Sequence, residues 1–270
     1  MFNMEPRIKI FETNKQDGVL CRNKKFYDKA LSEDTIKQIF KETRRKLGVK
    51  NGFKGEKMFQ ANQKSPDKSD LYEDGKYVVL DDTFMQKEDY WYEDIKTDIL
   101  VLEDKYKGIV VGHPMADCPI IIIEDRKKGV TALSHCGASY IDRLLPQQTV
   151  EALIKEFNSN PEDLYAYIGS SAKKESYVYE TYPKWANNKE LWKDTITKED
   201  DGYHIDLVTT ITKQLVKKNI KNITISPIDT ITNDKYYSHY ASFKGKMDKY
   251  GQNFVGFFYK LGGHRKWVLV

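Results

Sequence analysis

The sequence predicts a mixed α/β fold of the α+β kind, a mixed-sheet sandwich with flanking helices. Three segments carry apolar residues at helical spacing, and many shorter apolar runs have the length and the period of β-strands. The two kinds of segment interleave along the whole chain, without a linker-like stretch or an internal repeat. We therefore expect residues 1–270 to form a single domain.

The first helix is predicted over 32–50, after a strand over 7–13. Ser32 or Asp34 suits its N-terminus and Gly48 its C-terminus, because short polar side chains cap the first turn and glycine ends the last one. The buried face of this helix is expected to carry Ile36, Ile39, Phe40 and Leu47.

The remaining elements follow from the same two patterns. Apolar runs between turn residues predict strands over 55–63, 76–82, 97–104, 108–125 with a break at Pro114–Asp117, 129–137, 161–169 and 222–226. Helical spacing predicts further helices over 146–157 and 204–220. A Gly-Gly turn predicts a hairpin over 253–270, and the charged segment 64–76 is interpreted as an exposed loop.

Composition favours an ordinary soluble globular protein that does not bind nucleic acid. Hydrophobic residues make up 40% and charged residues 31% of the chain. The 44 basic and 40 acidic residues are mixed along the sequence, and the lysine clusters are short and interrupted. No long basic face with interleaved aromatic residues is present, so a nucleic-acid partner is not expected.

The sequence favours a cytoplasmic location. The N-terminal residues reach Arg7 and Lys9 without the apolar region of a signal peptide, and the longest apolar run, Pro119 to Ile123, is too short to cross a membrane. Three cysteines are an odd and low number, unlike a disulfide framework, and they favour a reducing compartment. No particular oligomeric state is predicted.

The segment 112–140 concentrates the residues that could carry chemistry. Cys118 begins a buried strand, where its thiol could be a nucleophile, a soft metal ligand or an inert core residue. His135 ends the next strand. If the two strands pair across the turn at 124–129, both residues reach the same end of the sheet, as a nucleophile–base pair, as two zinc ligands, or with His135 as a purely structural histidine.

Neighbouring residues extend this candidate site. Asp117 could orient a histidine or bind a substrate hydroxyl, and it could equally cap a turn. His113 is a further candidate for the same site, whereas Cys136 should face the opposite side of the strand. His204 and His264 are interpreted as surface residues, and the role of His239, in an aromatic segment rich in hydroxyls, stays open.

These segments resemble a known family. "MADCPIIIIED" followed by "GVTALSHCG" is similar to the pattern of the laccase-domain proteins, in which Thr-Ala-Asp-Cys opens one strand and His-Ala-Gly-Trp-Arg-Gly ends the next. The resemblance covers nearly the whole chain. It includes "EDTIKQIFKETRRKLGVK", "PEDLYAYIGSSAKKESYVY", "YHIDLVTTITKQLVKKNI" and "YYSHY", in the family's order.

The resemblance implies a fold, an activity and a metal. The family is an α/β sandwich related to the cysteine-hydrolase domain of a bacterial toxin, and its better-supported activity is that of a zinc-dependent purine nucleoside phosphorylase, with adenosine deamination also known. Its zinc ligands are a histidine of an early Gln-Val-His, the cysteine and the second-strand histidine. Two ligands match Cys118 and His135, but Asn62 stands at the third position.

The chain also departs from the family elsewhere in the site. A Trp-Arg pair is replaced by Ala138 and Ser139, Ile-Gly-Pro ends in Ser170, and a late arginine pair is replaced by Tyr240 and Ala241. Arginine binds phosphate through a bidentate fork that these residues cannot supply, and asparagine is a poor zinc ligand. These changes put phosphate binding and zinc binding in doubt.

Three functions are therefore considered. The leading hypothesis is a purine nucleoside phosphorylase-like enzyme that cleaves adenosine or inosine with phosphate, with zinc on Cys118, His135 and Asn62 or His113, and with Asp117 in a catalytic role. The alternatives are a metal-free Cys-His hydrolase and a non-catalytic binding module. A multicopper oxidase is disfavoured, because the five histidines are scattered and contain no His-x-His pair.

Overall fold

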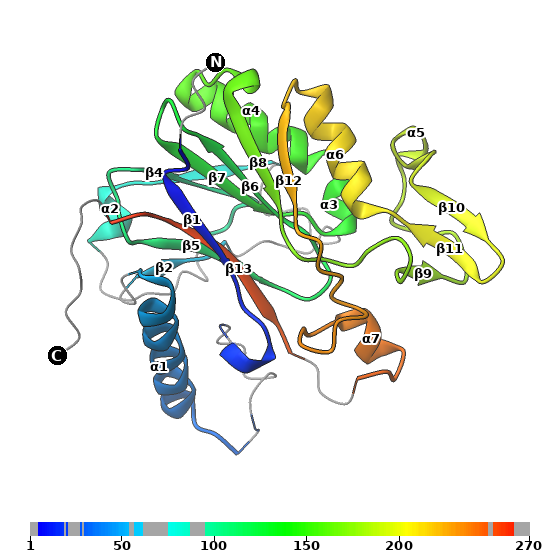
Figure 1. Ribbon diagram of the computed structural model, residues 1–270, viewed down its shortest axis with the longest axis horizontal. Coiled ribbons are helices and arrows are strands. Elements are labelled where there is room, and N and C mark those ends of the chain that lie inside the picture. Colours follow the sequence, from blue (N-terminus) through cyan, green and yellow to red (C-terminus); the bar gives the residue numbers. More distant parts are fainter. Residues whose placement is uncertain are drawn as a thin grey trace.

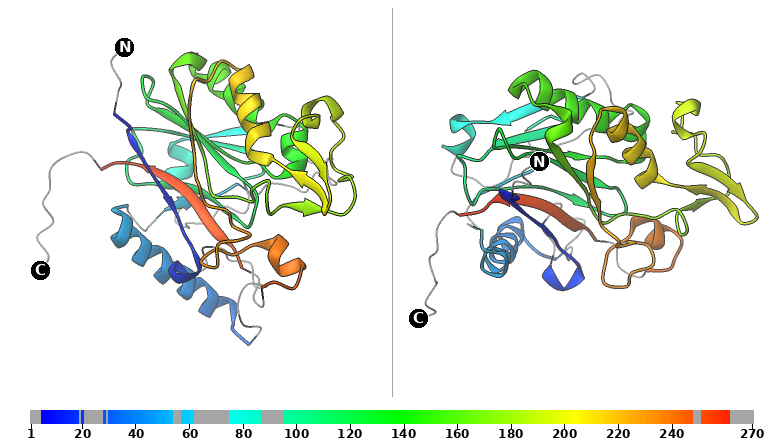
Figure 2. Two further views of the ribbon diagram at one scale, coloured as in Figure 1. Left: turned by 45° about the vertical axis from the view of Figure 1, so that its right-hand side comes forward. Right: turned by 45° about the horizontal axis from the view of Figure 1, so that its top comes forward.

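A computed structural model shows a layered α/β fold in which two sheets pack face to face between helices (Figure 1). The structure describes residues 5–18, 20, 28, 30–53, 57–61, 75–86, 95–247 and 251–261. Helix α1 (Glu33–Asn51) covers the outer face of the smaller sheet. Helices α3 (Ala138–Asp142), α4 (Leu145–Phe157) and α6 (Leu207–Lys217) cover the outer face of the larger one (Figures 1 and 2). The predicted sandwich of mixed sheets with flanking helices is thus confirmed.

The larger sheet has six strands in the order β12-β8-β6-β7-β4-β3. These strands are β12 (Asn222–Ile225), β8 (Leu164–Ile168), β6 (Ile120–Asp125), β7 (Val130–His135), β4 (Ile99–Glu103) and β3 (Tyr77–Leu80). The outer pairs β12–β8 and β3–β4 are parallel, whereas the central strands are antiparallel. The sheet is therefore mixed.

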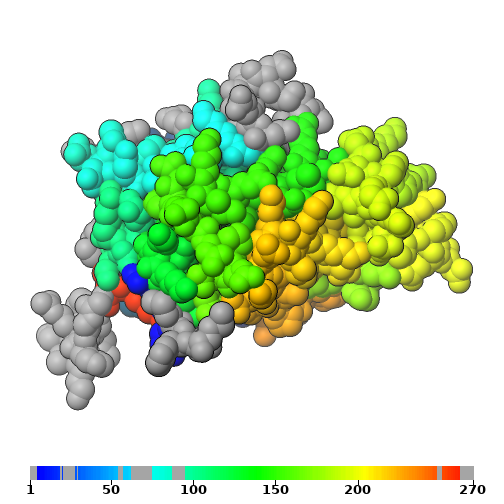
Figure 3. Space-filling model, turned by 90° about the horizontal axis from the view of Figure 1, so that it is seen from above, coloured from blue at the N-terminus to red at the C-terminus, as the bar shows by residue number. Residues whose placement is uncertain are grey.

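The smaller sheet has four strands in the order β1-β13-β5-β2. They are β1 (Ile8–Glu12), β13 (Asn253–Tyr259), β5 (Val110–Met115) and β2 (Met58–Phe59). A third sheet of three short strands, β10 (Ile196–Glu199), β11 (Gly202–Ile205) and β9 (Val178–Tyr179), projects at one end of the molecule (Figures 1 and 3). The sequence did not predict this third sheet.

The remaining helices are α2 (Asp82–Met85), α5 (Lys189–Trp192) and α7 (His239–Phe243). Helix α6 starts three residues later than predicted, because residues 204–205 complete β11 and Asp206 caps the helix by accepting the N–H of Thr209 at 2.8 Å. Within the described residues, no helix is long and apolar enough to cross a membrane.

Alternating side chains along the central strands supply two separate cores. Leu100, Leu102, Ile120 and Ile122 pack between the two sheets, whereas their sequence neighbours pack against the helices on the other face. This is the two-residue period of a strand that is buried on both faces. A third core, between the smaller sheet and α1, is mainly aromatic, with Phe11, Phe40, Phe53, Phe254 and Phe258.

Two details of α1 differ from the prediction. Ser32 caps the helix, as one of the two candidates proposed, and its Oγ accepts the N–H of Thr35. The helix passes through Gly48 and ends at Asn51, because the left-handed residue that closes it is Gly52, at φ 84°. Ile39 is 38% exposed, so it lies at the boundary of the buried face rather than within it.

The break in the predicted segment 108–125 also lies slightly later than expected. Pro114 belongs to β5, where it is opposite Phe254, and the chain turns between Met115 and Ile120. The turn places Asp117 at φ 82°. At the C-terminus β13 is observed, whereas the second strand of the predicted hairpin lies outside the described residues, as does most of the segment 64–76.

Candidate functional site

Pairing of β6 with β7 brings Cys118 and His135 to one end of the larger sheet. The ladder runs from Asp125 opposite Val130 to Ile120 opposite His135, and it continues with the N–H of Cys136 donating to Pro119 O at 2.8 Å. A Cβ atom on Gly137 would lie 3.5 Å from Cys118 Sγ and 4.0 Å from His135 Nε2. The thiol and the imidazole therefore converge on the same small residue.

His113 reaches this place from the other sheet. It lies on β5 opposite Val255, and its ring stacks on that of His135 with centroids 4.5 Å apart and planes inclined by 21°. Its Nδ1 is 2.7 Å from the carbonyl oxygen of Pro114. The structure thus brings Cys118, His135 and the further candidate His113 together.

Burial keeps these groups neutral when no metal is bound. It raises the pKa of Cys118 to about 12, with the charge of Asp117 adding to the effect. It lowers the pKa of His113 to about 4 and that of His135 well below its usual range, where the nearby His113 contributes. A neutral thiol beside a neutral imidazole is not the ion pair that a Cys–His nucleophile requires.

Asp117 is occupied with protein contacts. Its Oδ1 accepts the hydroxyl of Thr230 at 2.7 Å, and its Oδ2 accepts the N–H of Tyr240 at 2.7 Å. Its carbonyl oxygen accepts the N–H of Ala172 at 2.9 Å. Burial raises the pKa of Asp117, and these hydrogen bonds oppose that rise. Asp117 therefore anchors three chain segments beside Cys118, a structural role that differs from the turn cap considered as its alternative.

A cavity of about 490 Å³ opens beside Asp117 and Cys118. Its wall is rich in tyrosine. The rings of Tyr177 and Tyr179 meet edge to face at 5.3 Å, and those of Tyr177 and Tyr240 at 5.4 Å. His239, Phe243, Lys244 and Glu180 also line the cavity. Lys244 Nζ is 3.5 Å from Glu180 Oε1, and this ion pair lies on the cavity wall together with the carboxyl group of Asp117.

Several of these cavity residues were missed by sequence reasoning. Tyr177 and Tyr179 lie before and on β9, a strand that the alternation of "SYVYE" could have indicated. Tyr240 and Lys244 belong to or follow the short helix α7, and Tyr240 donates its hydroxyl to Val178 O. This contact joins segments 62 residues apart, which no local pattern reveals.

The described residues supply only part of the ligand set that a zinc ion needs. Among them, no group of three or more His, Cys, Asp or Glu residues has a geometry that could hold a metal ion. The ring of His113 is engaged by backbone groups, since its Nδ1 lies 2.7 Å from Pro114 O and the backbone of Ala61 also hydrogen-bonds to it. Cys118 and His135 are two donors, whereas protein zinc sites commonly use three or four. Asn62 lies outside the described residues.

Cys136 and His204 complete the comparison with the prediction. Cys136 is fully buried in the core between the larger sheet and the helices, on the face expected for it. His204 is not a surface residue, since it is only 6% exposed. Its Nε2 is 2.7 Å from Asp201 Oδ1 and its Nδ1 is 3.1 Å from Lys174 O, because β11 turns it under the neighbouring loop. His264 lies outside the described residues.

His204 predicts a pH-dependent stability. The hydrogen bond to Asp201 is the largest cause that raises its pKa above 6.5, so the folded state favours the imidazolium. The stabilisation of the folded state by this hydrogen bond is fully present below the unfolded pKa of about 6.5. It is lost as the pH rises through the higher pKa of the folded state. We expect the Tm difference between the wild type and His204→Gln to be largest at low pH and to shrink above neutrality. A difference that is constant from acidic to alkaline pH would contradict this assignment.

Comparison with known proteins gives consistent matches. The family model described as multi-copper polyphenol oxidoreductase laccase matches residues 32–254. A purine nucleoside phosphorylase of Bacteroides thetaiotaomicron is 27% identical over 137 residues, which are 48% of this chain and 50% of that protein. A purine nucleoside phosphorylase of Clostridium acetobutylicum is 24% identical over 177 residues, which are 58% and 72% of the two chains. The match thus spans about half the length of the first relative.

Solved structures share the fold. The hypothetical protein YfiH of Bacillus licheniformis superposes with a TM-score of 0.65 and 18% identity, over 83% of this chain and 82% of that one. Protein NMB0706 of Neisseria meningitidis, of the family DUF152, superposes with a TM-score of 0.67 and 13% identity, over 95% and 96% of the two chains. At these identities the likeness establishes the arrangement of helices and strands alone.

Proposed function

Because the chain belongs to the multi-copper polyphenol oxidoreductase laccase family, we propose that it is a purine nucleoside phosphorylase-like enzyme acting at the cavity beside Cys118. The observation that carries the proposal is the convergence of Cys118 and His135 next to a tyrosine-lined cavity of about 490 Å³. Two relatives that bear the name purine nucleoside phosphorylase support it. The proposed substrates are adenosine and inosine.

The cavity suits a nucleoside by its size and its wall. Ligand pockets for small molecules commonly measure about 300–1,000 Å³. Purine rings stack on aromatic side chains, and each such stack contributes roughly 1–3 kcal/mol in nucleic-acid binding. Tyr177, Tyr179 and Tyr240 offer these rings on one wall, and their hydroxyl groups add hydrogen-bonding capacity.

The proposed reaction is a transfer of ribose to phosphate. The bond between the ribose C1′ and the purine nitrogen breaks, a phosphate oxygen forms the new bond to C1′, and the base leaves with a proton. Lys244 is the cation on the cavity wall that would attract phosphate, since the family's arginine pairs are replaced by Ala138–Ser139 and Tyr240–Ala241. Asp117 would act as a positioning residue, because it holds Tyr240 and the start of α7 against the cavity.

Zinc is the proposed cofactor, with Cys118 and His135 as its ligands and Asn62 at the third position of the family pattern. A bound zinc ion supplies Lewis acidity. Whether Cys118 and His135 hold zinc is best tested by measuring the metal content of protein that was purified without added zinc. A non-catalytic binding module would keep the cavity and bind a nucleoside without converting it, so turnover separates the two functions.

Release of free base from nucleosides tests the proposal. Adenosine and inosine are incubated with the purified full chain, with and without phosphate, and adenine and hypoxanthine are separated by chromatography. We expect release that depends on both phosphate and protein. Release that is equal without phosphate would favour the hydrolase. Binding of adenosine without release of base, in protein supplied with zinc and phosphate, would favour the binding module.

A further inference from the structure

The two packed sheets differ in width, and this leaves one sheet face uncovered. Side chains from β3, β4, β7 and β6 fill the core between the sheets, whereas β8 contributes only the partly buried Tyr167 and β12 contributes no described residue. On the other sheet, β1 is the edge strand among the described residues: the backbone N–H groups at its start donate to Glu124 of β6, and its last residue, Glu12, accepts the hydroxyl of Tyr167 of β8 at 2.8 Å. The β8 and β12 strands therefore extend past β1, with one face not covered by the smaller sheet.

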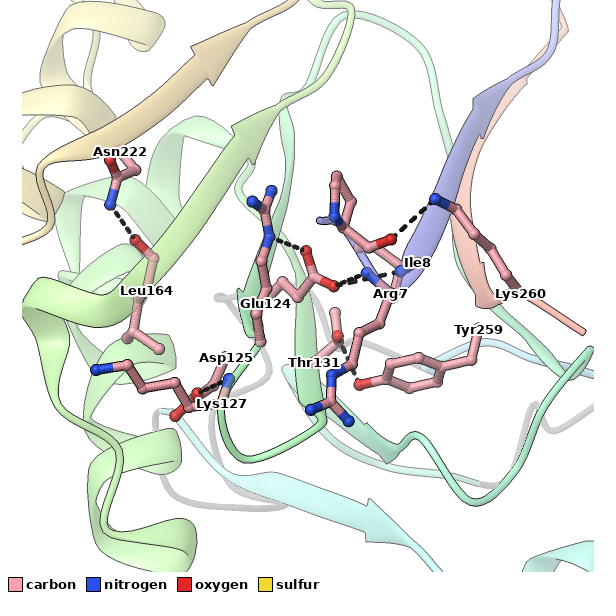
Figure 4. A network of polar contacts seen from close by, with 12 residues as sticks. Arg7, Ile8, Glu124, Asp125, Lys127, Thr131, Leu164, Asn222, Tyr259 and Lys260 are labelled. Carbon is pink, nitrogen blue, oxygen red and sulfur yellow. Dashed lines mark hydrogen bonds and ion pairs between the residues drawn. The ribbon is translucent and has the colours of Figure 1, made fainter. Parts of the chain in front are cut away.

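Where β8 and β12 extend past β1, the surface has a groove of about 670 Å³, here called the edge groove. Ile8 and Ile10 of β1 form its wall, and Tyr165, Tyr167 and Thr224 lie on the uncovered face of β8 and β12. Figure 4 shows the polar contacts around Glu124, with Asn222 and Leu164 on one side of this residue and with Ile8 and Lys260 on the other. The edge groove shares no lining residue with the cavity beside Cys118.

The backbone of β1 offers hydrogen bonds along this groove. Arg7 and Thr13 exchange backbone hydrogen bonds with the β13 side, since Lys260 N–H donates to Arg7 O and Thr13 N–H donates to Phe254 O. The even-numbered residues between them therefore point their N–H and C=O groups outward. Glu124 Oε1 accepts a hydrogen bond from the outward N–H of Ile8 at 3.2 Å. The N–H and C=O groups of Ile10, two residues later, point in the same direction. Among the described residues no strand pairs with this side of β1, and an open edge of this kind is a template for a further strand.

The charge of the edge groove is strongly biased. Four cationic side chains, Lys9, Arg126, Lys221 and Lys260, line it together with one carboxylate, Glu124. Lys221 is paired with Glu162 at 2.8 Å and Lys9 Nζ donates to Asn51 O at 2.7 Å, so the cations left to face a ligand are Arg126 and Lys260. Arg126 is held in place by its hydrogen bond to Glu124 at 2.9 Å and by stacking 3.5 Å above the ring of Tyr165. This groove therefore favours a ligand with negative charge at the end where Arg126 and Lys260 lie.

We propose that the edge groove binds an extended, acidic peptide segment of a partner protein, which adds to β1 as a fifth strand of the smaller sheet. The backbone of the peptide pairs with the outward groups of Ile10. Its alternate apolar side chains cover Tyr165 and Tyr167, and carboxylates near one end meet Arg126 and Lys260. The groove offers one feature for each part of the peptide: an open edge for its backbone, an uncovered sheet face for its apolar side chains, and a surplus of cations for its carboxylates.

Selection from a phage library of random 12-residue peptides on the immobilised full chain tests the proposal. We expect the enriched peptides to alternate β-branched or aromatic residues with polar ones and to carry Asp or Glu at one end. Affinity of a synthetic enriched peptide should fall about tenfold in Lys260→Glu, and should fall with added salt. Thr224→Trp, which fills the groove at an exposed position, should weaken binding equally or more.

A matched substitution at an exposed site outside the groove, Val216→Trp on α6, should leave peptide affinity unchanged. A version of the peptide with prolines at alternate positions should not bind, because proline lacks the N–H needed for strand pairing. Enriched peptides without acidic residues, or binding that is insensitive to Lys260→Glu and Thr224→Trp, would overturn the proposal. So would self-association of the chain that these two variants abolish, since the occupant would then be a second copy.

Discussion

Replacing Cys118 by alanine is expected to lower kcat/KM for the phosphorolysis of inosine by at least about 100-fold and to remove bound zinc. Cys118 Sγ and His135 Nε2 converge at Gly137, and the thiol is the softest donor there. His135→Ala should have the same two effects. Coupled spectrophotometry gives the rate, and elemental analysis of the purified protein gives the metal content.

Cys136→Ala is the matched control for this experiment. Cys136 lies one residue after His135 and is fully buried, but its side chain packs in the core against the helices. We expect this variant to keep its zinc and most of its activity, and to lose a little stability from the small cavity. An active Cys118→Ala protein with unchanged metal content would refute the proposed role of Cys118.

Replacing Asp117 by alanine is expected to lower the free energy of unfolding by about 3 kcal/mol, which is the combined size of lost buried hydrogen bonds and of a strained left-handed residue. The carboxylate accepts the Thr230 hydroxyl and the Tyr240 N–H, both buried or half-buried, and φ of Asp117 is 82°. Urea unfolding measures this loss. Loss of the Tyr240 contact should also raise KM for nucleosides, because Tyr240 lines the cavity.

Two further substitutions separate these causes. Asp117→Asn keeps one acceptor oxygen and tolerates positive φ, so its loss of stability should be smaller than that of the alanine variant. Asp117→Gly removes the backbone strain but also both acceptors, so its loss of stability should lie between those of the asparagine and alanine variants, with the Tyr240 N–H left unsatisfied. Equal stability of all three variants and the wild type would contradict the anchoring role.

The hairpin that carries Cys118 and His135 could be predicted because its information is local. A strand has a two-residue period, and the turn predicted at 124–129, which the structure places at 126–129, fixes the register between two neighbouring runs. Counting from that turn predicts that both residues lie at one end of the sheet. Cys136 was assigned to the opposite face by the same alternation.

The tyrosine wall of the cavity could not be predicted in this way. It combines Tyr177 and Tyr179, near a two-residue strand, with Tyr240 on a five-residue helix. Such short elements have weak periodicity, and the contacts between them depend on the three-stranded sheet, whose strands are distant from α7 in sequence. The position of His113 was similarly hidden, because it depends on packing between two different sheets.

Two predictions were wrong: the end of α1 and the exposure of His204. In α1 the helix continues past Gly48, beside the buried Leu47, and ends at the left-handed Gly52. An exposed His204 is predicted because the residue lies next to a helix start. The β10–β11 hairpin, which the sequence analysis missed, is what folds it against Lys174.

The identity of the product formed from inosine and phosphate tests the central claim most directly. Phosphorus NMR of the reaction of the full-length protein distinguishes ribose 1-phosphate from unchanged phosphate. The proposed function predicts that ribose 1-phosphate appears in step with hypoxanthine in the wild type and in Cys136→Ala, and that neither product appears in Cys118→Ala. Formation of hypoxanthine with free ribose, or no product from zinc-loaded wild-type protein, would contradict it.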